Sequence, residues 1–203
     1  MKPWSRALVL SVMIAGSCNV QAVEYRHIQI AQSAVTFTYQ QMGVTMEGTF
    51  GQWVADLRFD PDQPTAAQVT VDVDLAHIDT GSAEGNTEVA GKAWLNTPTF
   101  PTARFVAKSV EPLGDQRYTV TGSLTIKGRT QNIVIPTTFT SQGPIGVFAG
   151  HFTLHRADFA IGEGPWAAFD VVANDIQIQF RMTVHADTAP STTAHLPQPQ
   201  SQP

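Results

Sequence analysis

The sequence contains a single cysteine among its 203 residues. One thiol excludes both a disulfide framework and a cysteine-rich metal site within one chain. Positive charge is also scarce, because 12 Lys and Arg face 17 Asp and Glu, for a net charge of -5. A chain without a basic excess has little with which to displace counterions from phosphates, which argues against a nucleic-acid-binding protein. Hydrophobic residues at 42% and charged residues at 14% indicate a globular domain and not a disordered chain.

No apolar run reaches the roughly 20 residues that a membrane-spanning helix needs. The most concentrated apolar stretch covers residues 7–14, follows Lys2 and Arg6, and precedes a small-x-small sequence at 20–22. This three-part pattern is typical of a secretory signal peptide. We therefore expect residues 1–22 to be removed when the protein is exported.

Both ends of the chain are expected to lie outside the folded domain. Cys18 is expected to be removed with the signal peptide. The exported chain then has no thiol, which suits an oxidising compartment. A weaker alternative is that residues 15–18 form a lipoprotein-processing site and that Cys18 becomes a lipidated N-terminus. Residues 186–203 contain four prolines and no apolar periodicity, and predict a disordered tail. The predicted folded domain therefore covers residues 23–185.

Apolar and polar residues alternate with a period of two through most of this domain. Such alternation is typical of strands with one apolar and one polar face. Turn-forming residues separate the runs, as at 60–62, 114–115 and 127–129. About eight antiparallel strands fit a barrel or a sandwich, and closure into a barrel removes the exposed edges of long strands. The expected strands lie at 35–40, 53–59, 69–75, 103–110, 118–126, 131–140, 147–156 and 176–184.

One stretch lacks the alternation and predicts a short helix. It covers residues 82–94, with Ser82 as N-cap and Glu84 placed to favour the helix N-terminus. Pro98 and Pro101 end the helical stretch and return the chain to a strand. A second irregular segment, residues 161–169, predicts a lid-like turn.

Two groups of residues invite a metal or catalytic interpretation. His151 and His155 share a strand face but lie about 13 Å apart along it, too far for one ion without a bend. His77 stands near Asp74 and Asp79. Solvent-facing or hydrogen-bonded histidines are the simpler interpretation of both groups, and we expect no metal site.

Four carboxylates cluster late in the sequence: Asp158, Glu163, Asp170 and Asp175. A buried pair with one raised pKa would serve acid–base chemistry. No nucleophile motif, zinc-protease motif or phosphate-binding glycine loop accompanies them. The simpler interpretation is that Asp158 and Asp170 cap turns or pair with Arg156.

The aromatic residues leave a choice between a solid and a hollow barrel. A barrel of about eight strands encloses an interior just wide enough to be filled or to hold one small ligand. Periodicity alone does not decide between these two, and on the strands at 131–140 and 147–156 apolar residues occupy both faces.

Short motifs between residues 33 and 162 together resemble the YceI-like family of exported bacterial proteins. Each motif is weak alone, and their order along the chain makes the resemblance specific. Residues 122–130 resemble the family's G-x-L-T-I-x-G hairpin, and residues 156–162 resemble its R-x-D-F-G-I-G motif. The other matching stretches are 33–37 with Gly43, 48–51, 57–60, 71–81 and 100–105.

This resemblance implies an all-β fold, an antiparallel eight-stranded lipocalin-like barrel whose short helix, about 82–94, covers or flanks the mouth. It implies a periplasmic carrier that encloses a polyisoprenoid, a fatty acid or a fatty amide, and that is neither an enzyme nor dependent on a cofactor. A homodimer and a transient membrane-surface contact are further expectations. Each buried CH₂ of a ligand contributes roughly 0.8 kcal/mol, so a long chain needs no catalytic group to bind tightly.

The candidate ligand-binding residues combine inward-facing strand positions with two residues at the mouth. Trp94 and Trp166 are the expected gate, and Gly122 is expected to leave room for the chain. The full set is Phe37, Tyr39, Val71, Val73, Trp94, Phe105, Val120, Gly122, Leu124, Phe139, Phe152, Trp166, Ile178 and Phe180.

The sequence departs from the family pattern at two places. Ala160 stands where a glycine is usual, so the backbone there is less free to adopt positive φ. Residues 83–89 read A-E-G-N-T-E-V where many relatives carry a more basic sequence. If polar groups of this helix contact the ligand head group, its chemistry differs here.

Two alternatives to a carrier remain. An outer-membrane barrel fits the length and the alternation, but it predicts apolar residues on the outside and paired aromatic girdles. An enzyme acting on a lipid-like substrate would use Asp158 and Glu163, or His151.

Overall fold

The computed structural model describes residues 23–187. The predicted signal peptide, with Cys18, and almost all of the predicted tail lie outside the described residues. The described part is mainly strand, with one short α-helix, α1 (Ala83–Ala90), and several short 3₁₀ segments. The strands are β1 (Tyr25–Ile28), β2 (Ala34–Gln41), β3 (Val44–Phe50), β4 (Trp53–Arg58), β5 (Gln68–Asp74), β6 (Ile78–Asp79), β7 (Thr102–Gly114), β8 (Arg117–Ile126), β9 (Arg129–Gln142), β10 (Ile145–His155) and β11 (Asp175–Ala186).

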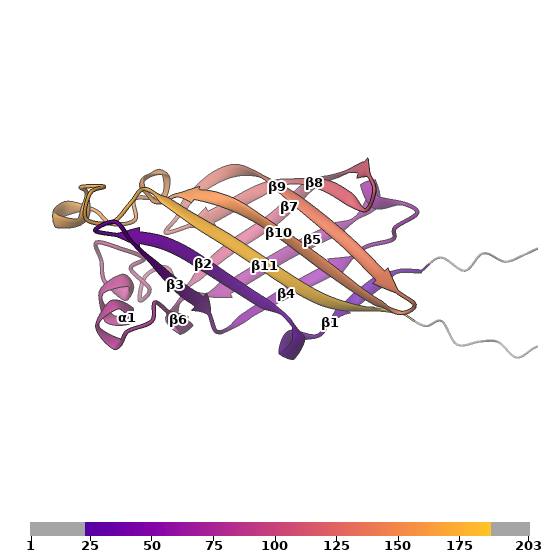
Figure 1. The fold of residues 1–203 in the computed structure, drawn as a ribbon, viewed down its shortest axis with the longest axis horizontal. Helices are drawn as coiled ribbons and strands as arrows, with labels where there is room; N and C mark the ends of the chain where they lie inside the picture. The colour runs from indigo at the N-terminus through magenta and orange to yellow at the C-terminus, as the bar shows by residue number, and fades with distance from the viewer. Residues whose placement is uncertain (1–22, 188–203) are drawn as a thin grey trace, which may run out of the picture.

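The strands form one antiparallel sheet that curls into an elongated barrel (Figure 1). The order is β4-β5-β7-β8-β9-β10-β11-β2-β3-β6, and β1 lies off this path and pairs with the end of β11, beyond the residues that pair with β2. Tyr25 of β1 and Phe59, directly after β4, exchange two backbone hydrogen bonds of 2.8 and 3.1 Å. β1 therefore joins the β11 side of the sheet to its β4 side and closes this end of the barrel. The all-β, lipocalin-like architecture expected from the sequence is confirmed.

The expected count of eight strands was too low, because the sheet has eleven strands. β1 and β6 have only four and two residues, too few to show alternation. β3 was missed because Gly48 stands at an inward position where the pattern calls for a large apolar residue. A Cβ on Gly48 would lie 2.1 Å from Cζ of Phe37, so the Phe37 ring takes the place of the missing side chain.

Helix α1 begins where the sequence indicates and ends earlier than expected. Ser82 is the N-cap, and its Oγ accepts a hydrogen bond of 3.0 Å from the Gly85 amide. The helix ends at Ala90 and not at residue 94, because the backbone of Gly91 is extended (φ -67°, ψ 166°) and cannot continue the helix. The chain then turns, and the Trp94 and Leu95 amides bond to the carbonyls of Gly91 and Val89.

The tight hairpin expected at Lys127 and Gly128 is present between β8 and β9. Ile126 and Arg129 face each other, and the two residues between them have φ of +50° and +73°. Positive φ at both central positions is the type I′ geometry that matches strand twist. Gly128 suits its position, whereas Lys127 accepts a left-handed conformation.

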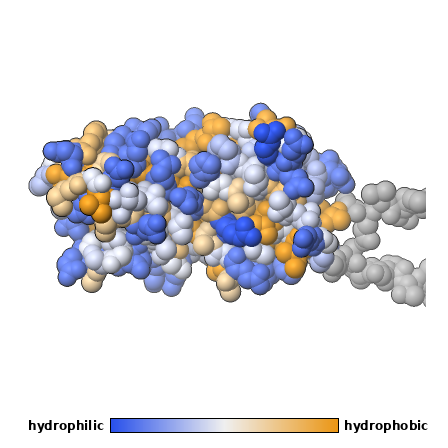
Figure 2. Space-filling model, in the orientation of Figure 1, coloured by the Kyte–Doolittle hydropathy of each residue, from blue (hydrophilic) through white to orange (hydrophobic). Residues whose placement is uncertain are grey.

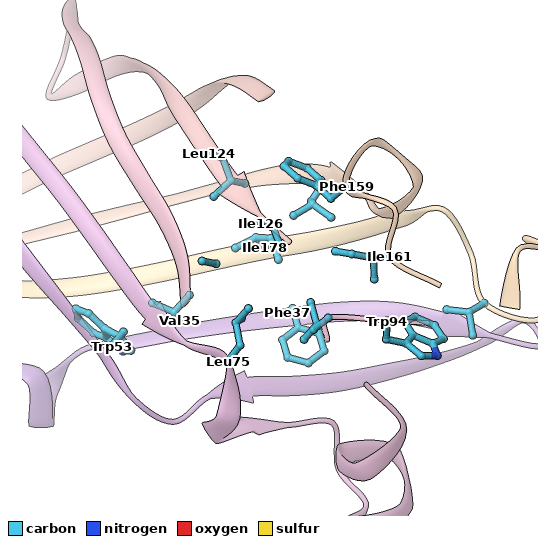
Figure 3. Packing of buried hydrophobic residues seen from close by; sticks show 14 residues of the cluster. Val35, Phe37, Trp53, Leu75, Trp94, Leu124, Ile126, Phe159, Ile161 and Ile178 are labelled. Carbon is cyan, nitrogen blue, oxygen red and sulfur yellow. The ribbon is translucent and has the colours of Figure 1, made fainter. Parts of the chain in front are cut away.

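Buried apolar residues form two clusters along the barrel axis. The larger cluster includes Phe37, Trp53, Leu75, Leu124 and Ile178, which come from five different segments (Figure 3). The smaller cluster contains Tyr25, Leu57, Phe59, Phe139, Val184 and Ala186, with Phe148 packed against it. Figure 2 shows that the face in view is mainly hydrophilic, with scattered apolar patches.

Candidate functional site

The barrel interior is hollow. A cavity of about 600 Å³ runs through it and is lined overwhelmingly by apolar side chains, to which every strand from β1 to β11 contributes. Val71, Val73 and Val120 point inward yet are only half-buried, because the space they face holds no other side chains. The structure thus resolves the choice between a solid and a hollow barrel in favour of the hollow one.

Most of the sequence-predicted ligand-binding residues are brought together around this cavity. Those that line it come from strands β2, β5, β7, β8, β10 and β11 and from the two loops at the mouth. They are Phe37, Tyr39, Val71, Val73, Trp94, Phe105, Val120, Leu124, Phe152, Trp166, Ile178 and Phe180.

Gly122 and Phe139 are not among the lining residues. A Cβ on Gly122 would lie 2.4 Å from the Phe105 ring, so Phe105 already fills the space that Gly122 was expected to leave for a ligand. Phe139 packs edge-on against Phe59, with ring centroids 4.8 Å apart, and belongs to the smaller cluster. Phe139 therefore helps to close the barrel end instead of walling the cavity.

On β9 and β10 the sequence has apolar residues on both faces, so it did not show which of them point into the cavity. On β9 the inward residues are Ile133, Ile135 and Thr137. On β10 they are Phe148 and Leu154, in addition to the predicted Phe152. Strict alternation holds on both strands, so one known inward residue on each would have been enough to assign the rest.

Polar side chains gather at one end of the cavity, next to α1. Gln41, Thr80, Ser82, Glu84 and Glu88 all line this end. The opposite end is mostly apolar: it has the hydroxyl of Tyr118 and that of Thr137, which donates to the Ile135 carbonyl at 3.2 Å. A ligand with one polar and one apolar end therefore meets matching surroundings in one orientation only.

Tyr39 marks the border between the apolar and the polar part. Its hydroxyl reaches the Thr80 carbonyl at 3.5 Å, the outer limit of a hydrogen bond. Burial raises the pKa of Tyr39 above its ordinary value, because the phenolate would lose hydration. The hydroxyl is therefore a neutral donor with a weak partner.

The two tryptophans expected at the mouth lie against each other there. The Trp94 and Trp166 ring centroids are 5.5 Å apart with an interplanar angle of 57°. The Trp166 indole donates to Oε1 of Glu88 on α1 at 2.7 Å. Within residues 23–187, the indole nitrogen of Trp94 is a buried side-chain donor without a hydrogen-bond partner.

Arg156 holds the irregular segment between β10 and β11 in place. It is almost fully buried, and its guanidinium donates to six backbone carbonyls, those of residues 161, 162, 166, 168, 172 and 173. The Trp94 and Phe169 rings lie 5.5 and 5.0 Å from its Cζ. Burial lowers the pKa of Arg156, although its charge is stabilised by these carbonyls and rings. The expected pairing with Asp158 or Asp170 is not made, because Arg156 binds carbonyl oxygens instead.

Ala160, the departure noted in the sequence, does adopt the left-handed conformation that glycine favours, with φ of +54°. Lys127 lies over this turn and donates to the Ala160 carbonyl at 2.6 Å and to Glu163 at 3.1 Å. The turn after the short 3₁₀ segment η4 (Arg156–Phe159) is therefore fixed by contacts from another hairpin, in spite of the alanine.

The alternative catalytic and metal-binding candidates lie away from the cavity. His155 bonds to Asp175 at 2.8 Å and His77 to Asp74 at 2.9 Å, both on the surface. Asp158, Glu163 and His151 do not line the cavity. In the part of the chain that the structure describes, no three His, Cys, Asp or Glu residues are grouped to hold a metal ion. Among the same residues, no helix has the length and apolarity needed to cross a membrane.

A hollow antiparallel β-barrel with one polar mouth and an apolar interior defines the class of protein as lipocalin-like. Residues 27–184 match the sequence model of the YceI-like domain. The chain belongs to the YceI-like family.

Similar proteins agree in sequence and in fold. A UPF0312 protein of Pseudomonas savastanoi pv. phaseolicola is 33% identical over 168 residues, which cover 78% of this chain and 88% of that protein. The crystal structure of BcnA from Burkholderia cenocepacia superposes with a TM-score of 0.75 at 35% identity, covering 77% of this chain and 98% of BcnA. A polyisoprenoid binding domain from Saccharophagus degradans shares the fold, with a TM-score of 0.62 at 13% identity over 82% of this chain and 99% of the domain.

Proposed function

We propose that the protein is an exported, periplasmic carrier that encloses a long-chain amphiphile, a polyisoprenoid or a fatty acyl compound, inside the barrel. The apolar cavity of about 600 Å³ carries this proposal. Its volume lies within the range of about 300–1,000 Å³ that is usual for ligand sites. The polyisoprenoid binding attributed to the domain from S. degradans gives the proposal support from a protein of the same fold.

The polarity of the cavity sets the orientation of the ligand. The tail lies toward Phe59 and Phe148, where the smaller aromatic cluster closes the barrel. The head group lies toward α1, within reach of Tyr39 and Thr80. Each CH₂ of the tail that leaves water contributes roughly 0.8 kcal/mol, so most of the affinity comes from chain length.

Binding without catalysis fits the cavity better than the enzymatic alternative. The carboxylates and the histidine that the alternative relies on lie outside the cavity lining. The outer-membrane alternative requires an apolar outer surface. Outward positions on β2, β8 and β11 are instead Thr, Ser, Gln and Arg, as at Thr36, Thr121 and Gln179.

Native mass spectrometry of the protein isolated from the periplasm, followed by lipid extraction, tests the proposal. We expect a co-purifying chain in the unmodified protein and none in Val120→Phe, which fills the cavity from inside. Val134→Phe adds the same ring on the outer face of β9 and serves as the control. A protein that carries no chain and gains none on incubation with farnesol or oleic acid would contradict the carrier function.

The periplasmic location, the processing of the N-terminus and the homodimer are predictions from the sequence. Fractionation after osmotic shock tests the periplasmic location, and mass measurement of the mature N-terminus separates cleavage after residue 22 from lipidation of Cys18. Sedimentation velocity tests the expected homodimer.

A further inference from the structure

Three apolar side chains project into solvent at the mouth end of the barrel, and we call them the apolar rim. They are Met42, Val44 and Phe169, with exposed fractions of 71%, 60% and 50%. Met42 lies in the turn between β2 and β3, Val44 is the first residue of β3, and Phe169 belongs to the segment before β11. Figure 1 shows both segments at the same end of the barrel as α1, opposite the end where β1 begins and β11 finishes.

The two segments of the apolar rim are tied together beside the cavity. The Met42 amide donates to the Val171 carbonyl at 2.9 Å, and Gln41 forms a β-bridge with Val172. Gln41 and Val172 also line the cavity. The apolar rim is therefore continuous with the cavity wall, unlike exposed apolar residues such as Val54 and Val134 on the barrel side.

We propose that the apolar rim docks on the surface of a zwitterionic lipid bilayer, so that the mouth of the cavity faces the membrane. This inference goes beyond chain binding and rests on the proposed function for its purpose. An apolar tail that passes from the bilayer along Met42 and Phe169 into the cavity avoids contact with water. The contact is small and reversible, because three side chains bury far less apolar surface than a stable anchor.

Charge and area favour a zwitterionic bilayer over other occupants. Glu84 and Glu88 line the mouth, and Asp170 adjoins Phe169. None of these three forms an ion pair within residues 23–187. Two copies meeting mouth to mouth would place these carboxylates against one another, and an anionic bilayer would place them against head groups of the same charge. A stable dimer also needs about 800 Å² from each partner, which three side chains do not supply.

Flotation with vesicles of phosphatidylcholine tests the docking. The test variant is M42N/V44T, chosen because asparagine tolerates the positive φ of +50° at position 42 and threonine has the shape of valine. The matched control is V54T/V134T, which changes two equally exposed valines on the barrel side. Thermal unfolding checks that both variants are folded.

We expect the unmodified protein and the control to float, and M42N/V44T to float at least fivefold less. We also expect weaker flotation when phosphatidylglycerol replaces half of the phosphatidylcholine. Equal flotation of M42N/V44T and the control, or no flotation of the unmodified protein, would overturn the inference, as would a dimer that M42N/V44T abolishes. Val120→Phe separates the two proposals, because it should lose chain binding and float normally.

Discussion

The indole of Trp166 and the carboxylate of Glu88 are joined across the mouth of the cavity by a hydrogen bond of 2.7 Å. Trp166 belongs to the 3₁₀ turn η5 (Gly164–Trp166) and Glu88 to α1, so the bond links two segments 78 residues apart in sequence. Trp166 also lies against Trp94. Trp94, Trp166 and Glu88 all line the cavity, so we expect a ligand that leaves by the polar end to pass them.

Trp166→Phe keeps an aromatic ring at the mouth and removes the N–H group. A partly exposed hydrogen bond contributes about 1 kcal/mol, so we expect the dissociation rate of a bound chain to rise about fivefold. The affinity should change less, because uptake becomes faster as well. Stopped-flow displacement of a fluorescent fatty acid measures the rate. Glu88→Ala in the Trp166→Phe background should add nothing, and additive effects would show that the bond does not form the barrier.

Gly122 and Phe105 are a matched pair on neighbouring strands. Gly122→Ala places a methyl group 2.4 Å from the Phe105 ring, and overpacking of this kind costs about 1–3 kcal/mol. Urea unfolding measures the loss. Phe105→Leu in the same chain removes the contact with the ring, although the Val106 carbonyl oxygen stays 2.6 Å from the added methyl group, so the double variant should lose less stability than the sum of the single variants. Strict additivity would contradict the contact.

Arg156→Lys keeps the positive charge and removes the fork that reaches six carbonyls. An ammonium has three donors, so about three carbonyls lose their partner, at about 1 kcal/mol or more each. We expect a loss of about 3 kcal/mol in the free energy of unfolding and faster hydrogen exchange in residues 161–173. Arg181→Lys, on the exposed face of β11, should change stability by less than about 0.5 kcal/mol. A similar small change for Arg156→Lys would contradict its structural role.

The sequence carries enough information for the barrel and for most of its inner wall, because alternation with a period of two specifies which residues share a face. The alternation gives the wrong answer where a large side chain on one strand occupies the space over a glycine on the neighbouring strand. Phe37 does so over Gly48, and Phe105 does so over Gly122. Alternation cannot reveal such compensation, since it depends on which residues face each other across strands.

The arrangement of the residues at the mouth of the cavity could not be predicted from the sequence either. Arg156 is held by backbone carbonyls, which have no signature in the residue pattern. The motif around Arg156 and Ala160 pointed to this segment only through the family resemblance. The apolar rim depends on the meeting of two loops that are distant in sequence, which the register of β2 and β11 brings about.

Alkaline pH should destabilise the protein through two tyrosines. Burial raises the pKa of Tyr39 and of Tyr118 above the ordinary value of 10.0, so the unfolded chain loses these protons at lower pH than the folded protein. Their contribution is fully present below pH 10 and is lost as the pH rises through the raised values. Urea unfolding at pH 8 and pH 10.5 should show a smaller loss for Y39F/Y118F than for the unmodified protein. An equal loss would assign the effect to other groups.

The carboxylates of Glu84 and Glu88 should select against anionic head groups. Both line the exposed mouth, and Arg156, the cationic residue among those that line the cavity, already donates to carbonyls. Farnesol and farnesyl diphosphate share the same tail, so their affinity ratio isolates the head group. At low salt we expect E84Q/E88Q to bind the diphosphate about three- to tenfold more tightly and farnesol unchanged, because exposed charges contribute about 1 kcal/mol or less.

Salt separates this electrostatic effect from a change in shape. The Debye length falls from about 10 Å at 0.1 M to about 3 Å at 1 M salt, so the gain of E84Q/E88Q for farnesyl diphosphate should largely disappear at 1 M. Glu111→Gln, on β7 and outside the cavity lining, controls for the loss of a carboxylate away from the mouth and should leave the affinity ratio unchanged. A gain that persists at high salt, or that Glu111→Gln reproduces, would mean that the two mouth carboxylates do not set the head-group preference.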